Sequence, residues 1–182
     1  MSAIRDYFRK MKGGGAPPPR VSLGEMGWSF VGAFAGMGLV AWLNYNFLQG
    51  TGLILMLGSL GASAFLIFGA IKTPVAQPRN LVGGQVLSAI IGVAAYKICG
   101  GQPGLAAALA VAAATAAMLA TRTAHPPGGA TALIAVIGDE KIHGLGYFYA
   151  VMPVGAGVLI LLVVALIINN IPKTRRYPEF WI

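Results

Sequence analysis

Six apolar stretches alternate with short polar or Gly- and Pro-rich segments along the 182-residue chain. They cover residues 23–48, 52–71, 81–99, 105–120, 126–138 and 147–171. About 20 consecutive apolar residues are enough to cross the hydrocarbon core of a bilayer as one helix. The pattern therefore predicts an all-α protein, a polytopic membrane helical bundle with about six crossings.

The fifth stretch, residues 126–138, is too short to cross a membrane as a helix. Its 13 residues span about 20 Å at about 1.5 Å per residue, whereas the hydrocarbon core is about 30 Å thick. The segment before it, Thr121 to His125, would add roughly 16 Å if it were extended at about 3.3 Å per residue. We expect this crossing to be half extended strand and half helix, with the helix beginning at Pro126 near mid-depth.

Residue types that lipid-facing helices avoid gather at this junction of strand and helix. Irregular backbone at membrane depth must be buried in protein or line a cavity. A helix N-terminus offers unpaired N–H groups and a partial positive charge, which suit a small anion. We therefore predict an anion site at this helix start. Its candidate residues are Arg122, Thr123, His125, Pro126, Pro127, Gly128, Gly129 and Thr131.

A weak internal similarity predicts two repeats. Residues 61–68 align with residues 129–136 at an offset of 68, with three of eight positions identical and Ser63 opposite Thr131. Each segment lies in the second of three consecutive crossings, so the two repeats would have opposite orientation. Inverted-repeat transporters bind substrates where discontinuous helices meet near the midplane. We expect two inverted three-helix repeats with discontinuous second and fifth helices, although four crossings with re-entrant segments also fit.

Composition supports a membrane protein, and the charge distribution predicts its orientation. The chain is 57% hydrophobic and 10% charged, against about 25% charged residues in soluble domains. Five of the 13 Lys and Arg residues precede residue 21 and three follow residue 172. With six crossings, these eight lie on the same side as Lys72, Arg79 and Arg122, which the positive-inside rule makes cytoplasmic. This placement argues against nucleic acid as the partner of a chain with net charge +8.

Three segments follow from these patterns. Residues 1–22 form a basic, Gly- and Pro-rich cytoplasmic tail, residues 23–171 the transmembrane domain, and residues 172–182 a basic cytoplasmic C-terminal tail. In the first tail, Ile4, Tyr7, Phe8 and Met11 have the spacing of a short interfacial helix, and a loosely ordered tail fits as well. We expect the protein in the inner (plasma) membrane of a bacterial cell, with both termini cytoplasmic.

The sequence offers little for catalysis or metal binding. Its two histidines, one cysteine and few carboxylates are scattered, so we expect no metal site. No nucleophile, base and acid form a plausible set. The pair Gly128-Gly129 lacks the lysine and the spacing of a phosphate-binding loop. We expect no enzymatic activity and no cofactor.

Three motifs, in order along the chain, resemble the HPP family of integral membrane proteins, which is named for a His-Pro-Pro motif. Here that motif is His125-Pro126-Pro127, and it continues as Gly-Gly-Ala-Thr-Ala-Leu-Ile. The segments at residues 58–64 and 76–80 also resemble the family pattern, and the resemblance covers roughly residues 24–170. Family members in cyanobacteria and chloroplasts are associated with nitrite transport, so the resemblance implies this activity.

Each charged candidate has a functional and a structural interpretation. Arg79 and Arg122 either draw an anion to the cytoplasmic mouth or are interfacial arginines whose side chains reach the headgroups. His125 binds the anion, carries a proton or caps local backbone, since an imidazole changes charge near neutral pH.

Each uncharged candidate likewise has a functional and a structural interpretation. The hydroxyls of Ser59, Ser63, Thr123 and Thr131 either donate to an anion or bond to their own helix backbone. Gln77 and Asn80 line the mouth or fix the loop.

Our main hypothesis is a transporter of a small inorganic anion, nitrite, bound near mid-membrane where the N-termini of two half-helices face each other. The alternatives are an anion channel and a non-transporting membrane subunit that docks a partner through its basic termini. The expected surroundings are the lipid bilayer, and the sequence leaves open whether the chain forms a homo-oligomer.

Overall fold

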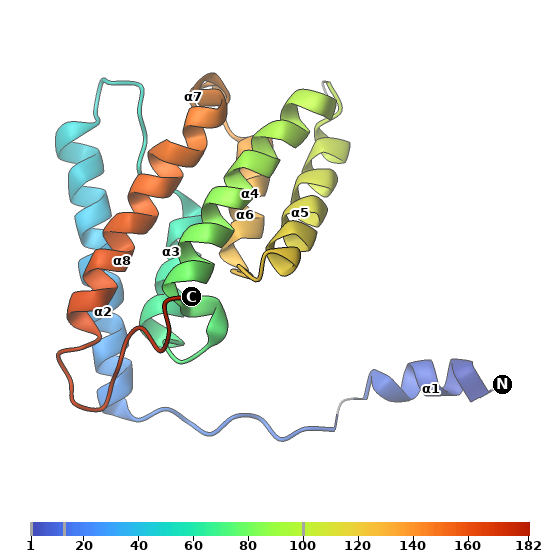
Figure 1. The fold of residues 1–182 in the computed structure, drawn as a ribbon, viewed down its shortest axis with the longest axis vertical. Coiled ribbons are helices and arrows are strands. Elements are labelled where there is room, and N and C mark those ends of the chain that lie inside the picture. Colours follow the sequence, from blue (N-terminus) through green and yellow to red (C-terminus); the bar gives the residue numbers. More distant parts are fainter. Residues whose placement is uncertain (1, 13, 100) are drawn as a thin grey trace.

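The structure, a computed structural model, describes residues 2–12, 14–99 and 101–182, and every regular element within these ranges is a helix (Figure 1). Four apolar helices in these ranges are long enough to cross a membrane. They are α2 (Leu23–Phe47), α4 (Pro78–Cys99), α5 (Pro103–Ala120) and the composite stretch Glu140–Ile168. The all-helical prediction is therefore confirmed for the described residues.

The composite stretch changes its helix type three times. It consists of α7 (Glu140–Leu145), a 3-10 segment (Gly146–Ala150), a π-helical segment (Val151–Gly155) and α8 (Ala156–Ile168). Met152, at φ −136° and ψ 119°, is not helical, as expected for a residue before a proline. The polar segment between the fifth and sixth apolar stretches forms most of α7 rather than a loop, because Asp139 caps this helix by accepting a hydrogen bond from the backbone N–H of Ile142 (3.1 Å).

Two shorter helices complete the bundle. Helix α3 (Gly58–Ala64) continues as a π-helical segment (Phe65–Gly69), and α6 covers Pro127–Ile137. Both begin after irregular backbone, and α6 begins one residue after the predicted start. The N-terminal helix α1 (Ser2–Lys10) precedes them all.

The extended strand predicted from Thr121 to His125 is absent. The N–H of Arg122 donates to Leu119 O (3.2 Å) and that of Thr123 to Met118 O (2.9 Å). This is the Schellman pattern that ends a helix, and it needs a left-handed residue. Arg122 is that residue, at φ 57°. The chain therefore turns sharply after α5, and only residues 123–125 run without regular structure before α6.

The loop between the second and third apolar stretches is shorter than the gap of residues 72–80 that separates them in the sequence. A 3-10 turn occupies Pro74–Ala76, and α4 already begins at Pro78. A proline suits the first helical position, because its missing N–H has no partner there anyway. Arg79 and Asn80, which precede the third apolar stretch in the sequence, therefore lie on the first turn of α4.

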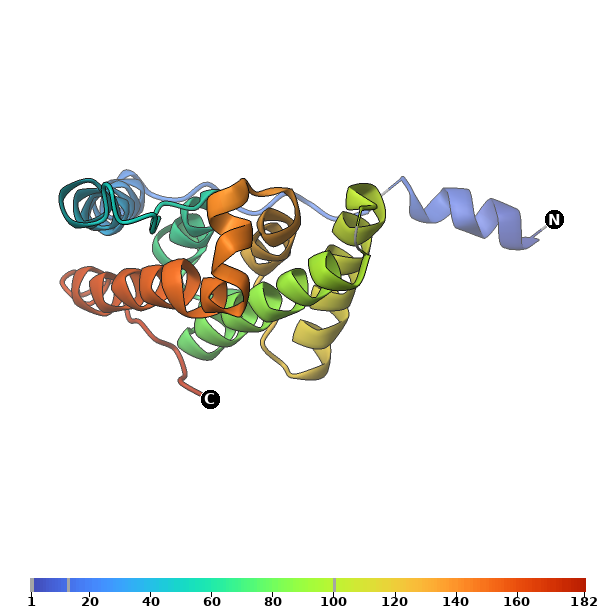
Figure 2. The same ribbon diagram turned by 90° about the horizontal axis from the view of Figure 1, so that it is seen from above.

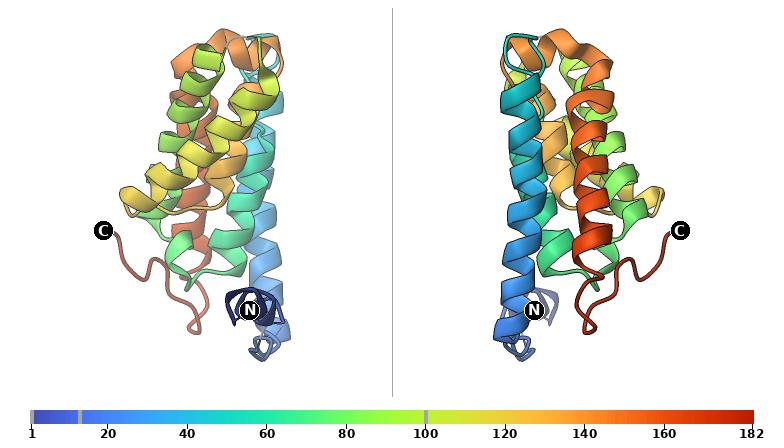
Figure 3. Two further views of the ribbon diagram at one scale, coloured as in Figure 1. Left: turned by 90° about the vertical axis from the view of Figure 1, so that its right-hand side faces the viewer. Right: turned by 90° about the vertical axis from the view of Figure 1, so that its left-hand side faces the viewer.

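The helices run alternately up and down, as drawn in Figure 1. Helix α2 packs against α8, and the two lie side by side in Figure 3. Helix α4 packs against α5, α6 and α8 and lies at the centre of the bundle (Figure 2). Because α2 begins and α8 ends at the same end of the molecule, both tails leave from that end (Figure 1).

Small residues let α4 and α6 approach each other closely. A Cβ added to Gly92 would lie 2.5 Å from Ala132 O, and one added to Gly84 would lie 2.6 Å from both Thr123 O and His125 Cβ. Such contacts are typical of helix pairs in membranes, which pack through small residues. This packing fixes the start of α6, and with it His125, against α4.

Candidate functional site

His125 lies fully buried in the short segment before α6, and both of its ring nitrogens have partners. Nδ1 is 2.7 Å from Val75 O and Nε2 is 2.8 Å from Ser63 Oγ. A carbonyl oxygen only accepts, so Nδ1 must carry a hydrogen. In the neutral ring, Nε2 then accepts from the Ser63 hydroxyl. The imidazole thereby links the loop before α4 to α3.

The hydrogen bonds continue from Ser63 across the bundle. Gln85 Nε2 donates to Ser63 Oγ (2.7 Å), and Gln85 Oε1 accepts from the Thr131 hydroxyl. The backbone oxygen of Thr131 in turn accepts from the hydroxyl of Tyr149 (3.1 Å). We call His125, Ser63, Gln85, Thr131 and Tyr149 the polar network; all five are fully buried. It joins α3, α4, α6 and the 3-10 segment in an otherwise apolar core.

Two further buried hydroxyls lie close to the polar network in sequence but outside it. Ser59 and Ser88 are each at most 1% exposed, and their Oγ atoms have no partner among the described residues. Ser59 precedes Ser63 by one helical turn on α3, and Ser88 Oγ faces Gly128, where an added Cβ would lie 2.6 Å from it. A buried polar group without a partner costs about 1–3 kcal/mol. Among the described residues, these two hydroxyls are thus the buried side-chain polar groups without a hydrogen-bond partner.

The start of α6 offers fewer donors than expected for an anion site. Pro126 and Pro127 have no N–H, while the N–H groups of Gly128 and Gly129 donate to His125 O (2.8 Å) and Pro126 O (3.0 Å). At the start of α3, by contrast, no atom of the described residues accepts a hydrogen bond from the N–H of Gly58 or Ser59. The unpaired backbone donors thus belong to α3.

The arginine and asparagine candidates surround the turn between α5 and α6. Arg79 Nη2 donates to Thr121 O (3.0 Å), and Asn80 Nδ2 donates to Ala124 O (2.9 Å). Arg122 is exposed on the same turn, while Thr123 is buried with its hydroxyl 2.7 Å from that of Thr121. Two positive charges thus lie near His125. Arg122 precedes it by three residues in the turn between α5 and α6, and Arg79 holds that turn through Thr121 O.

Gln77 has a structural environment. Its Nε2 donates to Ile71 O (2.8 Å) and Thr73 O (3.0 Å), and its Oε1 accepts from the N–H of Glu179 (2.8 Å). All these partners belong to the loop or to the C-terminal segment, so Gln77 lies apart from the polar network.

The prolines and glycines of the motif divide between core and surface. Pro127 and Gly128 are buried, whereas Pro126 is exposed and Gly129 is partly exposed. Pro126 lines a groove of about 450 Å³ between α3 and α6 and another of about 350 Å³ between α5 and α6. The second groove also reaches His125.

Three residues of this region were absent from the sequence-based candidates. Gln85, Ser88 and Tyr149 are all buried in the membrane-spanning helices. Gln85 had a detectable signal, since it is an amide within the apolar stretch 81–99. Ser88 and Tyr149 had none, because serine and tyrosine are common in membrane helices and only packing reveals their surroundings.

Within the described residues, no three His, Cys, Asp or Glu side chains come together as a metal site.

The chain matches the transmembrane region of the HPP family over residues 18–178. It is 46% identical over 178 residues to one transmembrane protein of Dictyostelium discoideum, covering 96% of this chain and 57% of that relative. A second D. discoideum transmembrane protein is 39% identical over 183 residues, with 98% of this chain and 64% of the relative covered. The chain thus spans about three fifths of these relatives. No solved structure was found to match it. The chain belongs to the HPP family of integral membrane proteins.

Proposed function

We propose that this protein is a membrane transporter of a small inorganic anion, with nitrite as the first candidate substrate. The observation that carries the proposal is the polar network, buried between two half-helices in an apolar bundle. Polar groups inside a membrane are costly and mark solute or proton pathways. Nitrite enters only through the family resemblance.

The arrangement of the half-helices supports alternating access by two inverted repeats. We assign α2, α3 and α4 to one repeat and α5, α6 and α8 to the other. Helices α3 and α6 run in opposite directions and pack against each other (Figure 1). In inverted-repeat transporters the substrate binds where such broken helices meet, and one repeat moves against the other.

An anion would enter from the end that carries the arginines. Arg79 and Arg122 raise its local concentration there, and the free hydroxyls of Ser59 and Ser88 replace part of its hydration shell. The opposite end has a hollow of about 650 Å³ lined by Asn44, Asp139 and Lys141, among others. This hollow would serve as the second mouth.

The polar network supplies a route for a proton that accompanies the anion. Ser63 Oγ lies within hydrogen-bonding distance of both His125 Nε2 (2.8 Å) and Ser59 O (3.1 Å). If His125 accepts a proton on Nε2, the new N–H donates to Ser63 Oγ and the Ser63 hydroxyl turns to Ser59 O. No heavy atom needs to move, so the network accommodates both charge states of the imidazole.

Nitrite uptake into proteoliposomes tests the proposal. We expect saturable uptake that increases with an inward proton gradient and falls at least tenfold in His125→Ala and Arg79→Ala. Lys72→Ala is the matched control, because Lys72 is an exposed cation on the loop before α4 and its loss should leave uptake unchanged.

Each other outcome identifies an alternative. Uptake that rises linearly with concentration indicates a channel. Folded protein without uptake above empty vesicles rejects transport of nitrite, and co-purification of a stable partner would then favour the non-transporting subunit. Normal uptake by both variants would reject the assigned site.

A further inference from the structure

Helix α1 separates apolar from charged side chains. Ile4, Tyr7, Phe8 and, on the turn that follows, Met11 are 59–69% exposed. Their spacing of three and four residues places them on one face of the helix. Large apolar side chains exposed on a single face indicate that the helix binds a surface.

The other face of α1 is basic. Arg5, Arg9, Lys10 and Lys12 are all exposed, and Asp6 is the one acidic residue between them. Asp6 and Arg9 form an ion pair (3.1 Å) with both side chains more than half exposed, a geometry that contributes little in water. The face therefore keeps a net positive charge.

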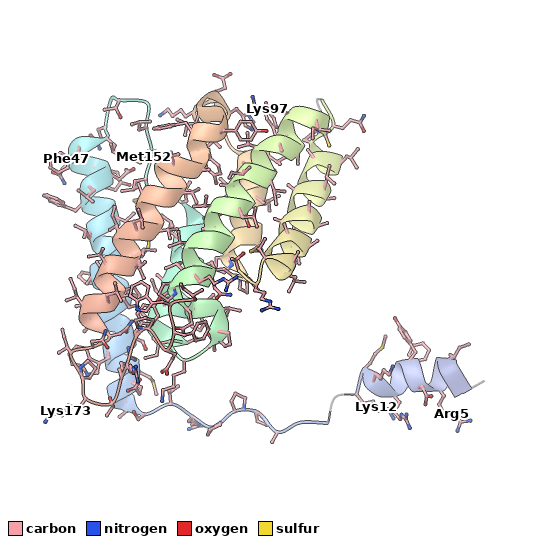
Figure 4. All side chains as sticks on the ribbon, viewed as in Figure 1. Arg5, Lys12, Phe47, Lys97, Met152 and Lys173 are labelled. Atoms are coloured by element: carbon pink, nitrogen blue, oxygen red, sulfur yellow. The ribbon has the colours of Figure 1, made fainter. Side chains whose placement is uncertain are left out.

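The helical bundle does not cover the apolar face of α1. Helix α1 lies apart from the bundle, beyond a segment of exposed residues that includes Pro17, Pro18 and Pro19 (Figures 1 and 2). Figure 4 shows Arg5 of α1 and Lys12 of the turn after it extending into open space. A helix of nine residues is marginal in water by itself. A surface that buries its apolar face would stabilise it.

We propose that α1 lies in the interface of the membrane that the bundle crosses, bound to anionic phospholipids. Its apolar face would enter the acyl-chain boundary, and its Lys and Arg side chains would contact the lipid phosphates. The membrane is always within reach, because twelve residues separate Lys10 at the end of α1 from Leu23 at the start of α2 and span at most about 43 Å.

This surface is separate from the proposed transport site. The match to the HPP family begins at residue 18, so α1 lies before the part of the chain that defines the family. Membrane attachment of α1 therefore does not depend on what the bundle transports, and the two proposals fail independently.

A polarity-sensitive fluorophore tests the orientation of α1 in the full chain. Cys99 is the single cysteine, so Cys99→Ala allows one new thiol to be labelled with NBD. We expect NBD at Tyr7→Cys to shift to the blue in nanodiscs with 30% phosphatidylglycerol, and NBD at Arg9→Cys, on the opposite face, to stay solvent-like. Equal emission at the two positions would overturn the proposal.

The charge requirement is tested with Arg5→Gln/Lys12→Gln in the Tyr7→Cys protein. Each Lys or Arg near an anionic surface contributes about fivefold to binding, so the ratio of docked to free α1 should fall about 25-fold. High salt should have a similar effect. A blue shift of the same size in nanodiscs of pure phosphatidylcholine would reject anionic lipid as the partner.

Discussion

Arg122 combines two properties that one pair of substitutions can separate. Its backbone is left-handed, at φ 57°, and its exposed guanidinium lies beside the turn that Arg79 holds. Glycine adopts this conformation freely, whereas alanine is strained there. We expect the free energy of unfolding of Arg122→Gly to be about 1 kcal/mol higher than that of Arg122→Ala. Chemical denaturation in detergent measures both values.

The two variants lose the same charge, so uptake isolates the role of the guanidinium. If Arg122 attracts the anion, Arg122→Gly and Arg122→Ala should both raise the KM for uptake at low salt by a similar factor. Wild-type uptake in Arg122→Gly would show that the residue serves only the turn. A more stable alanine variant would contradict the left-handed conformation.

Gln85 provides a test of the polar network that does not rely on transport. Gln85→Met removes both hydrogen bonds at once and leaves the Thr131 hydroxyl and a Ser63 lone pair unsatisfied. We expect a loss of about 1–3 kcal/mol in the free energy of unfolding. Thr131→Val alone should also destabilise the protein.

Together the two substitutions remove both partners of one hydrogen bond. The double variant Gln85→Met/Thr131→Val should therefore lose less stability than the sum of the single losses, by about 0.5 kcal/mol or more. Strict additivity of the unfolding free energies would mean that Gln85 and Thr131 do not interact.

At the scale of elements, the segment after α8 holds the ends of several helices. We call this segment, residues 169–182, the strap. Arg175 is buried and all five of its N–H bonds are used, with Glu25 and Ser29 of α2, Phe68 O and Asn169 Oδ1 as acceptors.

The same strap reaches the loop that orients His125. Tyr177 donates its hydroxyl to Ala76 O (2.7 Å), and burial raises the pKa of this phenol, so it remains a donor at any physiological pH. The neighbouring Val75 O accepts the hydrogen bond from His125 Nδ1. The C-terminal segment thereby fixes the position of the carbonyl that orients the imidazole.

Substitution of Arg175 tests the strap. We expect Arg175→Met to destabilise the protein by about 2–4 kcal/mol, because it leaves several acceptors and the partly exposed Glu25 carboxylate unpaired. Glu25→Gln, which keeps the backbone acceptors and the Ser29 bond, should cost less. Arg175→Lys should resemble the methionine variant, since lysine cannot reproduce the planar set of five donors. Equal unfolding midpoints for wild type and Arg175→Met would rule out this role.

The helices themselves were largely predictable, whereas the contacts between them were not. Apolar runs and proline positions predicted α2, α5 and the start of α6 to within about two residues, because length, composition and proline chemistry are local properties. The turn at Arg122 was missed because a left-handed arginine has no local signal. The bond between Ser63 and His125 joins residues 62 positions apart, and only tertiary packing determines it. Arg175 was assigned to a basic C-terminal tail, although the fold buries it against Glu25.

At the scale of the whole molecule, the two ends of the bundle are formed by different segments of the chain. The strap and the loop before α4 lie at one end, with Lys173, whereas Phe47 and Lys97 lie at the other (Figure 4). The groove beside Glu25 is lined by both Lys72 and Thr174, which places that loop and the strap together. If α3 and α6 each complete a crossing with the irregular segment before them, the three connections after α2, α4 and α6 lie on the side of the membrane opposite the two tails.

Thiol labelling from one side of the membrane tests this topology. In Cys99→Ala protein, we expect a membrane-impermeant maleimide to label Gln49→Cys and Lys141→Cys in intact cells, because both residues line the hollow at the far end. Lys72→Cys and Lys173→Cys should react only after permeabilisation, as the positive-inside rule requires. Labelling of Lys72→Cys from the outside, with Lys173→Cys protected, would mean that the segment containing α3 does not complete its crossing. Labelling of all four from the same side would reject the spanning arrangement, and with it the inverted repeats on which alternating access depends.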